Sequence, residues 1–176
     1  AEEERALAAE ARARGAELRV QDLLERLRGG GNDPDAELDV PTTWNGFAEW
    51  CDQALAGRLL LAPAARRNVK KPKFGDPALA ARSLHWLATV CRDRRLDGGG
   101  SLDDAVVEPG IRNAPCGADA FPFDFDGRRL TADWHIKNGG NTRDPERCLR
   151  IYYAWDEQTR QIVVADMPAH RVTGAT

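Results

Sequence analysis

The stretch LRIYYAWDEQTRQIVVADM, residues 149–167, decides the fold of this chain. Its first half has strand periodicity, because Leu149, Ile151, Tyr153 and Trp155 fall on one face of an extended segment while the polar positions fall on the other. Residues 156–159 can form a turn. Residues 161–167 are almost continuously aliphatic, which is typical of a strand buried on both faces. The pattern therefore predicts an antiparallel hairpin whose second strand is buried on both faces.

A second hairpin is predicted over residues 121–132. The residues Phe121, Phe123 and Phe125 alternate with polar or turn residues and lead into Asp-Gly at 126–127, a dipeptide typical of a two-residue turn. Pairing Phe125 with Arg128 then puts Phe121 opposite Ala132. We expect this core face to continue through Trp134 and Ile136, and the polar face to hold Arg129, Thr131, Asp133, His135 and Lys137.

The middle of the chain is predicted to be mostly helical. Thr42 or Thr43 can cap a short helix that ends at Gly57, and a strand is expected over residues 58–62. Pro63 can begin a helix through the basic residues that follow it. The buried positions of the short helix are expected to be Trp44, Phe47, Cys51 and Leu55.

A longer helix is predicted to begin at Asp76-Pro77, an N-cap followed by proline at the first helical position. It runs to Leu96 before glycines 98–100, and residues 101–118 are expected to be irregular or briefly helical. Its apolar stripe is Ala80, Leu84, Leu87, Ala88 and Cys91.

Residues 1–28 are predicted to be the end of a coiled coil, followed by a linker over residues 29–41 that is rich in glycine, proline and acidic residues. The predicted a/d seam is Ala6, Ala9, Ala13, Ala16, Val20, Leu23 and Leu27. Arginines at the g positions (Arg5, Arg12, Arg19, Arg26) and glutamates at e (Glu10, Glu17) favour a parallel homodimer through residues 5–27. The alternative is a single amphipathic helix packed on its own domain, because Leu7, Leu18 and Leu24 lie off the seam.

Composition indicates a globular protein. The 176 residues carry a formal net charge of −3, with 25 basic and 28 acidic side chains, so a nucleic-acid site would need a local basic patch. No apolar run approaches the roughly 18 residues of a membrane span. Four cysteines without regular spacing indicate reduced thiols, and we expect a cytoplasmic protein that is a fragment of a longer one. No cofactor or metal site is predicted.

The predicted fold is α+β, with helices on one face of a four- to five-stranded antiparallel sheet in a domain spanning residues 42–176. The strand assignments place His135, Lys137, Arg150 and Tyr152 on one polar face, with His170 and Arg171 just past the last strand. Such residues can move a 2′-hydroxyl proton and stabilise a phosphorane-like transition state during RNA cleavage. The same face could instead bind an anion or partner, or be an inert surface.

Residues 58–75 contain six basic and no acidic side chains. We predict that they contact nucleic-acid phosphates, with a solvated helix face as the alternative. The predicted nucleic-acid-binding residues are Arg66, Arg67, Lys70, Lys71, Lys73 and Arg143.

The closing segment, residues 150–171, resembles the last hairpin of RelE/ParE-like toxins, in which an Arg-hydrophobic-hydrophobic-Tyr strand turns through acidic residues into an aliphatic strand ending near His-Arg. The order of a strand, two helices and an antiparallel meander over residues 58–173 is also similar. The resemblance implies a RelE-like fold, and by motif position it carries over Arg150, Tyr153, His170 and Arg171. RelE-type members cleave ribosome-associated mRNA, whereas ParE-type members lack that activity.

Two functional hypotheses follow. The first is a RelE-like domain that contacts RNA or the ribosome, with ribonuclease activity in a toxin or defence context. The second is a non-enzymatic protein- or nucleic-acid-binding module that the coiled coil dimerises. Neither a phosphate-binding glycine loop nor a serine-nucleophile motif is present in the sequence. The chain also looks like the C-terminal part of long actinobacterial coiled-coil proteins of unassigned role.

Overall fold

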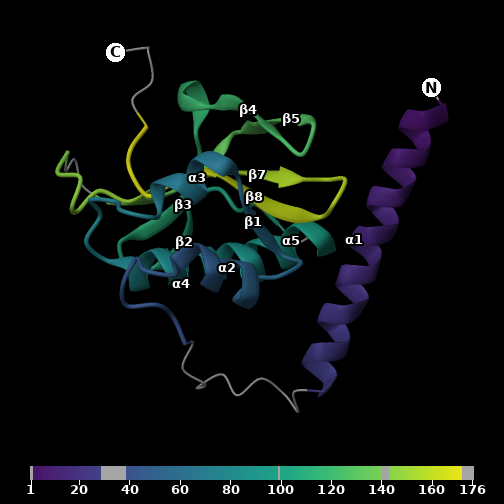
Figure 1. Ribbon diagram of the computed structural model, residues 1–176, viewed down its shortest axis with the longest axis horizontal. Coiled ribbons are helices and arrows are strands. Elements are labelled where there is room, and N and C mark those ends of the chain that lie inside the picture. The colour runs from purple at the N-terminus through teal and green to yellow at the C-terminus, as the bar shows by residue number, and fades with distance from the viewer. Residues whose placement is uncertain (1, 29–38, 99, 140–142, 172–176) are drawn as a thin grey trace.

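The computed structural model describes residues 2–28, 39–98, 100–139 and 143–171 (Figure 1). It is an α+β structure with a long N-terminal helix α1 (Glu2–Arg28), a six-stranded mixed sheet and a separate two-stranded sheet. Most of the predicted linker, residues 29–38, lies outside the described residues, and residues 39–41 have no regular secondary structure. The predicted α+β class is confirmed.

The strands of the large sheet lie in the order β1-β8-β7-β6-β3-β2. Strand β1 pairs with β8 in parallel, and the other neighbours pair antiparallel, so the predicted all-antiparallel sheet is corrected. Parallel pairing is possible because helices connect β1 to the later strands. The bounds are β1 (Leu59–Leu61), β2 (Ala105–Glu108), β3 (Ile111–Pro115), β6 (Trp134–Asn138), β7 (Arg150–Asp156) and β8 (Gln161–Asp166).

Residues 101–118, predicted to be irregular or briefly helical, instead contribute β2 and β3 to the large sheet. Asn113 explains why the strand pattern is hidden, because this polar residue occupies a fully buried position of β3. Its amide donates to the carbonyl of Leu102 (2.9 Å), and its oxygen accepts from the hydroxyl of Tyr153. Asparagine and proline are both uncommon in strands, so periodicity alone did not reveal β3.

The helices that follow α1 are α2 (Phe47–Ala54), α3 (Pro63–Asn68), α4 (Pro77–Trp86), the π-helix η1 (Leu87–Cys91) and α5 (Arg92–Asp97). The predicted cap at Thr42 or Thr43 is wrong, because α2 begins after Gly46 in a left-handed conformation. Helix α3 ends at Asn68, so Lys70, Lys71 and Lys73 lie beyond it rather than on a helix. Pro72 disfavours a helical conformation at the preceding residue and opposes a longer helix.

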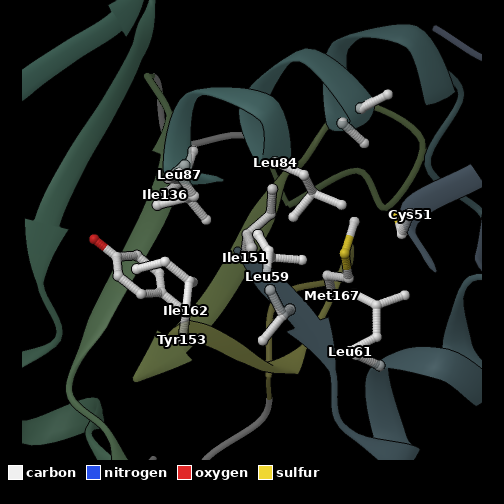
Figure 2. Packing of buried hydrophobic residues seen from close by; sticks show 14 of the residues in the cluster. Cys51, Leu59, Leu61, Leu84, Leu87, Ile136, Ile151, Tyr153, Ile162 and Met167 are labelled. Atoms are coloured by element: carbon white, nitrogen blue, oxygen red, sulfur yellow. The ribbon is translucent and has the colours of Figure 1, made fainter. Parts of the chain in front are cut away.

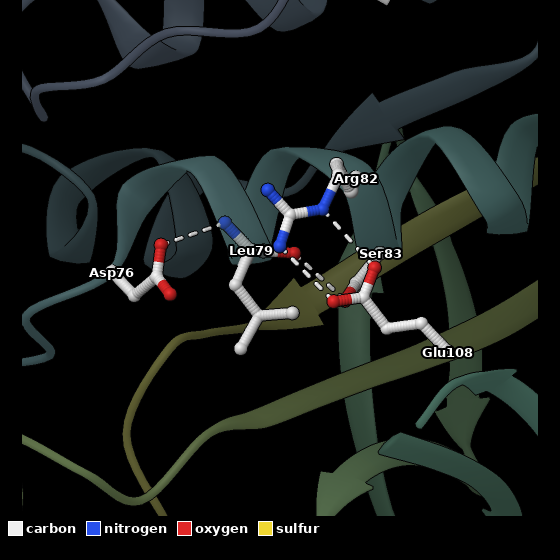
Figure 3. A network of polar contacts seen from close by, with 5 residues as sticks. All are labelled: Asp76, Leu79, Arg82, Ser83 and Glu108. Carbon is white, nitrogen blue, oxygen red and sulfur yellow. Dashed lines mark hydrogen bonds and ion pairs between the residues drawn. The ribbon is translucent and has the colours of Figure 1, made fainter. Parts of the chain in front are cut away.

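The predicted start of α4 is confirmed. The Asp76 carboxylate accepts a hydrogen bond from the backbone N–H of Leu79 at 3.0 Å, which satisfies one free donor of the first turn (Figure 3). Arg82 on the same helix forms a two-bond ion pair with Glu108 of β2, at 3.0 and 3.1 Å. This ion pair links helix α4 to β2, the edge strand of the large sheet.

The main core lies between the sheet and the helices α2, α4 and η1 (Figure 2). Its central side chains are fully buried, and they come from the predicted apolar positions of both layers. They include Leu84, Leu87, Ile136, Ile151, Tyr153 and Ile162. The predicted faces of the helix over residues 77–96 and of strand β7 are therefore confirmed.

A second core lies on the opposite face of the sheet. The strands β4 (Phe121–Phe125) and β5 (Arg128–Ala132) form the predicted hairpin in the predicted register, but as a separate two-stranded sheet. Phe121 and Ala132 pack against Tyr152 and Ala165, not beside Trp134 and Ile136 as predicted. The hairpin is thus folded over the sheet face opposite the helices, which the sequence predicted to be polar.

Helix α1 contacts its own domain through one stripe. Ala11 is buried, a Cβ at Gly15 would lie 3.0 Å from Cγ of Arg160, and Leu18 packs against Gly57. The main-chain carbonyl of Arg160 also accepts a hydrogen bond from the buried Arg92 at 3.0 Å. The stripe occupies heptad positions c and f, roughly 180° around the helix from the predicted a/d seam.

Candidate nucleic-acid interface

The sheet brings four predicted site residues together as two cross-strand pairs. His135 of β6 lies opposite Tyr152 of β7, and Lys137 lies opposite Arg150. The rings of His135 and Tyr152 are 5.8 Å apart in an edge-on arrangement. Directly opposed residues on one face of a sheet lie close enough to interact, so the predicted convergence of these four residues is present.

The β4–β5 hairpin buries one of the two pairs. His135 is 8% exposed and Tyr152 is 2% exposed, and the ring of Phe121 lies 5.6 Å from that of Tyr152. Neither ring nitrogen of His135 has a hydrogen-bond partner among the described residues. Both side chains lie on the predicted polar face of the sheet, but the hairpin covers them, so they are not accessible as a surface site would require.

The electrostatic surroundings of His135 oppose its protonation. Burial is the largest cause, and the nearby charges of Lys137, Arg150 and His170 act in the same direction, so that the pKa of His135 falls to about 4. Asp119, in the 3-10 turn that precedes β4, acts weakly in the other direction. His135 is neutral at pH 7, which leaves it able to accept a proton but not to donate one as an imidazolium.

The segment after β8 closes over the same face. The backbone N–H of Arg171 donates to the hydroxyl of Tyr152 at 3.0 Å, and the Arg171 guanidinium lies 3.7 Å from the ring centre of Phe121. Burial raises the pKa of Tyr152. His170 is exposed, while Lys137 and Arg150 are half-buried. The accessible part of this cluster is therefore cationic, and the buried part is a tyrosine and a neutral histidine.

The basic side chains of residues 66–73 lie on a surface separate from the His135 cluster. They lie next to a cavity of about 630 Å³ between α2, α3 and the hairpin. Arg67 and Lys70 line the cavity with exposed side chains, and no described acidic group forms an ion pair with either. Arg66 also lines it, but forms a two-bond ion pair with Asp52 at 2.6 and 3.0 Å.

The other predicted nucleic-acid-binding residues do not line this cavity. Lys71 and Lys73 are exposed beyond α3. Arg143 is exposed in the loop before β7, and no described contact joins it to this stretch.

Three aromatic residues line the same cavity, the buried Phe47 and the more accessible Trp44 and Phe125, and none of them was predicted to be a site residue. Trp44 is held in place by its indole N–H, which donates to the carbonyl of Phe74 at 2.8 Å, and by its ring contact with Phe47 at 4.7 Å. Phe125 reaches the cavity from the end of β4. Glu49 supplies the one carboxylate among the lining residues. No local signal in the sequence connects Trp44, Phe125 and the basic stretch, because they come from three separate elements.

The four cysteines are buried and form no disulfide. Burial raises the pKa of Cys51 and of Cys116 to about 12, so both are protonated thiols at neutral pH. Within the described part of the chain, no group of three or more histidine, cysteine or acidic side chains is arranged to hold a metal ion.

No family model matches the chain, and neither the curated proteins nor the solved structures contain a match to it. The described helices include none with the length and apolar character needed to cross a membrane.

Proposed function

We propose that this domain binds single-stranded RNA, with the cavity between α2, α3 and the hairpin holding one nucleotide. The main support for this proposal is that Arg67 and Lys70 line the same cavity as Trp44 and Phe125. Neither cation has an acidic partner among the described residues. Proteins that bind single-stranded nucleic acids combine cationic side chains, which bind phosphates, with aromatic rings, which stack on bases. A cavity of about 630 Å³ falls in the range of roughly 300–1,000 Å³ that small-molecule sites occupy, and a single nucleotide is a ligand of that size.

A RelE-like origin of the domain is part of this proposal. It is supported by the order of β1, the helices α3 and α4, and the antiparallel strands β6, β7 and β8. The strands β2 and β3 and the hairpin are inserted between the helices and that meander. The hairpin covers part of the sheet face that carries Arg150, which favours binding over catalysis for this domain.

Replacing Arg67 and Lys70 with glutamate is expected to weaken the binding of a short single-stranded RNA by tenfold or more. The slope of log affinity against log salt should fall by about 0.7 for each phosphate that the variant no longer binds, or about 1.4 for two phosphates. The measurement is fluorescence anisotropy of a labelled oligonucleotide at several salt concentrations. Phe125→Leu, which retains apolar bulk but removes the ring, should weaken binding roughly fivefold or more because a base can no longer stack there.

Arg129→Glu is the matched control, because Arg129 is an exposed arginine of β5 outside the cavity. It should leave both the affinity and the salt slope unchanged. Equal affinities for the wild type and the Arg67/Lys70 double variant would refute the proposed surface. Preferential binding of DNA would retain the surface but reject RNA as its ligand.

Ribonuclease activity is the second candidate function, and the cross-strand pairing of Lys137 with Arg150 beside His135 favours it. If this face cleaves RNA, then Arg150→Ala and Lys137→Ala should each lower the cleavage rate by roughly 100-fold, because these cations would stabilise the transition state. Arg129→Ala, at an exposed arginine of β5 that is not paired with either strand, is the control. RNA binding by the wild type without cleavage of free or ribosome-bound RNA would eliminate this candidate.

We also propose that α1 pairs in parallel with α1 of a second copy. The seam side chains that the structure describes, from Ala6 to Val20, are all exposed, and Val20 is 55% exposed. The face in contact with the domain is the one that a coiled coil leaves on its outside, so both contacts can exist together. The side chains of Leu23 and Leu27 lie outside the described residues.

The Ala13→Glu/Ala16→Glu double variant should convert a dimer into a monomer, because it buries four carboxylates at one dimer interface. Light scattering at high concentration would show the mass halved. Arg14→Glu, at an exposed b position of the same helix, should remain dimeric. A wild-type chain that is monomeric at high concentration would contradict the pairing.

A further inference from the structure

The geometry points to a second ligand site, a phosphate-binding pocket where α5 ends. Arg94 and Arg95 of α5, Ser101 in the following loop and Trp134 of β6 line a cavity of about 360 Å³. The described lining residues include no acidic side chain. The RNA pocket proposed above is lined by other residues, from α2, α3 and β4, so this inference does not depend on it.

The strongest argument is the uncompensated charge of Arg95. Its guanidinium lies 5.2 Å from the ring centre of Trp134, and its Nε and Nη2 atoms are buried beside the thiol of Cys91 and the hydroxyl of Tyr153. No described carboxylate forms an ion pair with Arg95. A partly buried cation without a counter-charge is costly, and a bound anion would offset that cost.

The polar groups packed against Arg95 do not supply the missing charge. They are the thiol of Cys91 and the hydroxyl of Tyr153, and burial raises the pKa of both, so that both are neutral at physiological pH. The Tyr153 proton is already donated to the side-chain oxygen of Asn113. The interior therefore neutralises none of the Arg95 charge, and the open side of the site is the remaining place for an anion.

The other lining groups fit a phosphate. Arg94 is exposed and adds a second guanidinium, and guanidinium groups match phosphate oxygens in both charge and geometry. The hydroxyl of Ser101 accepts a hydrogen bond from the backbone of Asp103 at 3.1 Å, which leaves its own proton available for a phosphate oxygen. The volume accommodates a phosphate with a small organic group. The π-helix η1 lies directly before α5, and π-helical turns are frequent at functional sites.

The test follows the indole N–H resonance of Trp134 by NMR while inorganic phosphate is added to the full chain at constant ionic strength. The Trp134→Phe variant assigns the resonance. We expect a saturable shift, and Arg94→Gln should raise the dissociation constant roughly tenfold, because it removes charge-assisted hydrogen bonds. Arg95→Lys, which retains the charge but not the planar group, should also weaken binding. Arg112→Gln, a change at an exposed arginine of β3, should not.

A shift that grows linearly without saturation, or that sodium chloride reproduces at the same ionic strength, would overturn the inference. So would an Arg94→Gln variant that binds phosphate as tightly as the wild type. Competition with an oligoribonucleotide that carries a 5′-phosphate, and with the same oligonucleotide lacking it, identifies the source. Competition by the phosphorylated form alone would assign the pocket to an RNA end, and competition by neither would assign it to a small phosphate monoester.

Discussion

Replacing Arg128 with methionine is expected to lower the free energy of unfolding by about 3–5 kcal/mol, because the change leaves a buried carboxylate without its cationic partner. The Asp156 side chain is only 2% exposed and forms a two-bond ion pair with Arg128, one bond of which is 2.7 Å long. Its remaining hydrogen bonds come from Thr159 at 2.7 Å and from the backbone N–H of Gln158 at 3.1 Å. The pair joins the β4–β5 hairpin to the turn between β7 and β8, so its removal should also loosen the cover over His135.

Urea denaturation at pH 7 measures this effect. The control is Arg129→Met, the neighbouring arginine, whose pair with Asp124 at 3.5 Å is highly exposed on both sides. Exposed pairs contribute about 1 kcal/mol or less, so the control should unfold nearly as the wild type does. Equal destabilisation by the two variants would show that burial of Asp156 is not the cause.

The destabilisation caused by Arg128→Met should itself depend on pH. Burial alone would raise the pKa of Asp156, but the hydrogen bonds from Arg128 and Thr159 outweigh it and hold the pKa below its ordinary value. A carboxyl group with a lowered pKa in the folded state stabilises the fold above its unfolded pKa, near 3.9, and this contribution is lost as the pH falls through the folded value. The difference between wild type and variant should therefore shrink below about pH 4.

Acidification from pH 7 to pH 4 is expected to cost the wild type about 3 kcal/mol of stability through His135 alone. The pKa of this histidine is about 4 in the folded protein, because of burial and of the charges of Lys137 and Arg150. It returns to about 6.5 on unfolding, so between these values the unfolded state binds the additional proton and stability falls as the pH is lowered. Burial and the charge of Arg58 also lower the pKa of the half-buried His85, so this histidine adds to the loss of stability as the pH falls.

His135→Leu isolates the contribution of His135. Neither ring nitrogen has a described partner, so the change removes no hydrogen bond, and stability at pH 7 should be unchanged or higher. The difference between the wild type and His135→Leu should change by about 3 kcal/mol between pH 7 and pH 4, as measured by urea denaturation at each pH. Parallel stability curves for the two proteins would show that His135 is not a buried neutral group.

Much of the polar face could be anticipated from local sequence, but the accessibility of its residues could not. The alternation in β6 and β7 placed His135, Lys137, Arg150 and Tyr152 together, and the register of the two strands confirms that. The position of the β4–β5 hairpin along the chain does not indicate which face of the large sheet the hairpin covers. The cavity near Arg67 and Lys70 was equally hidden, because its aromatic residues lie about 20 and 55 residues away along the chain.

The sequence by itself determined the features that arise within a few residues. Asp126-Gly127 specified the hairpin register, Asp76-Pro77 specified the start of α4, and the spacing of apolar residues specified the buried faces of α4, β7 and β8. Only the tertiary structure decided the parallel pairing of β1 with β8, the addition of β2 and β3 to the sheet, and the position of the hairpin over His135. The physical reason is that turn geometry and periodicity are local, whereas these contacts depend on which distant apolar surfaces bury each other.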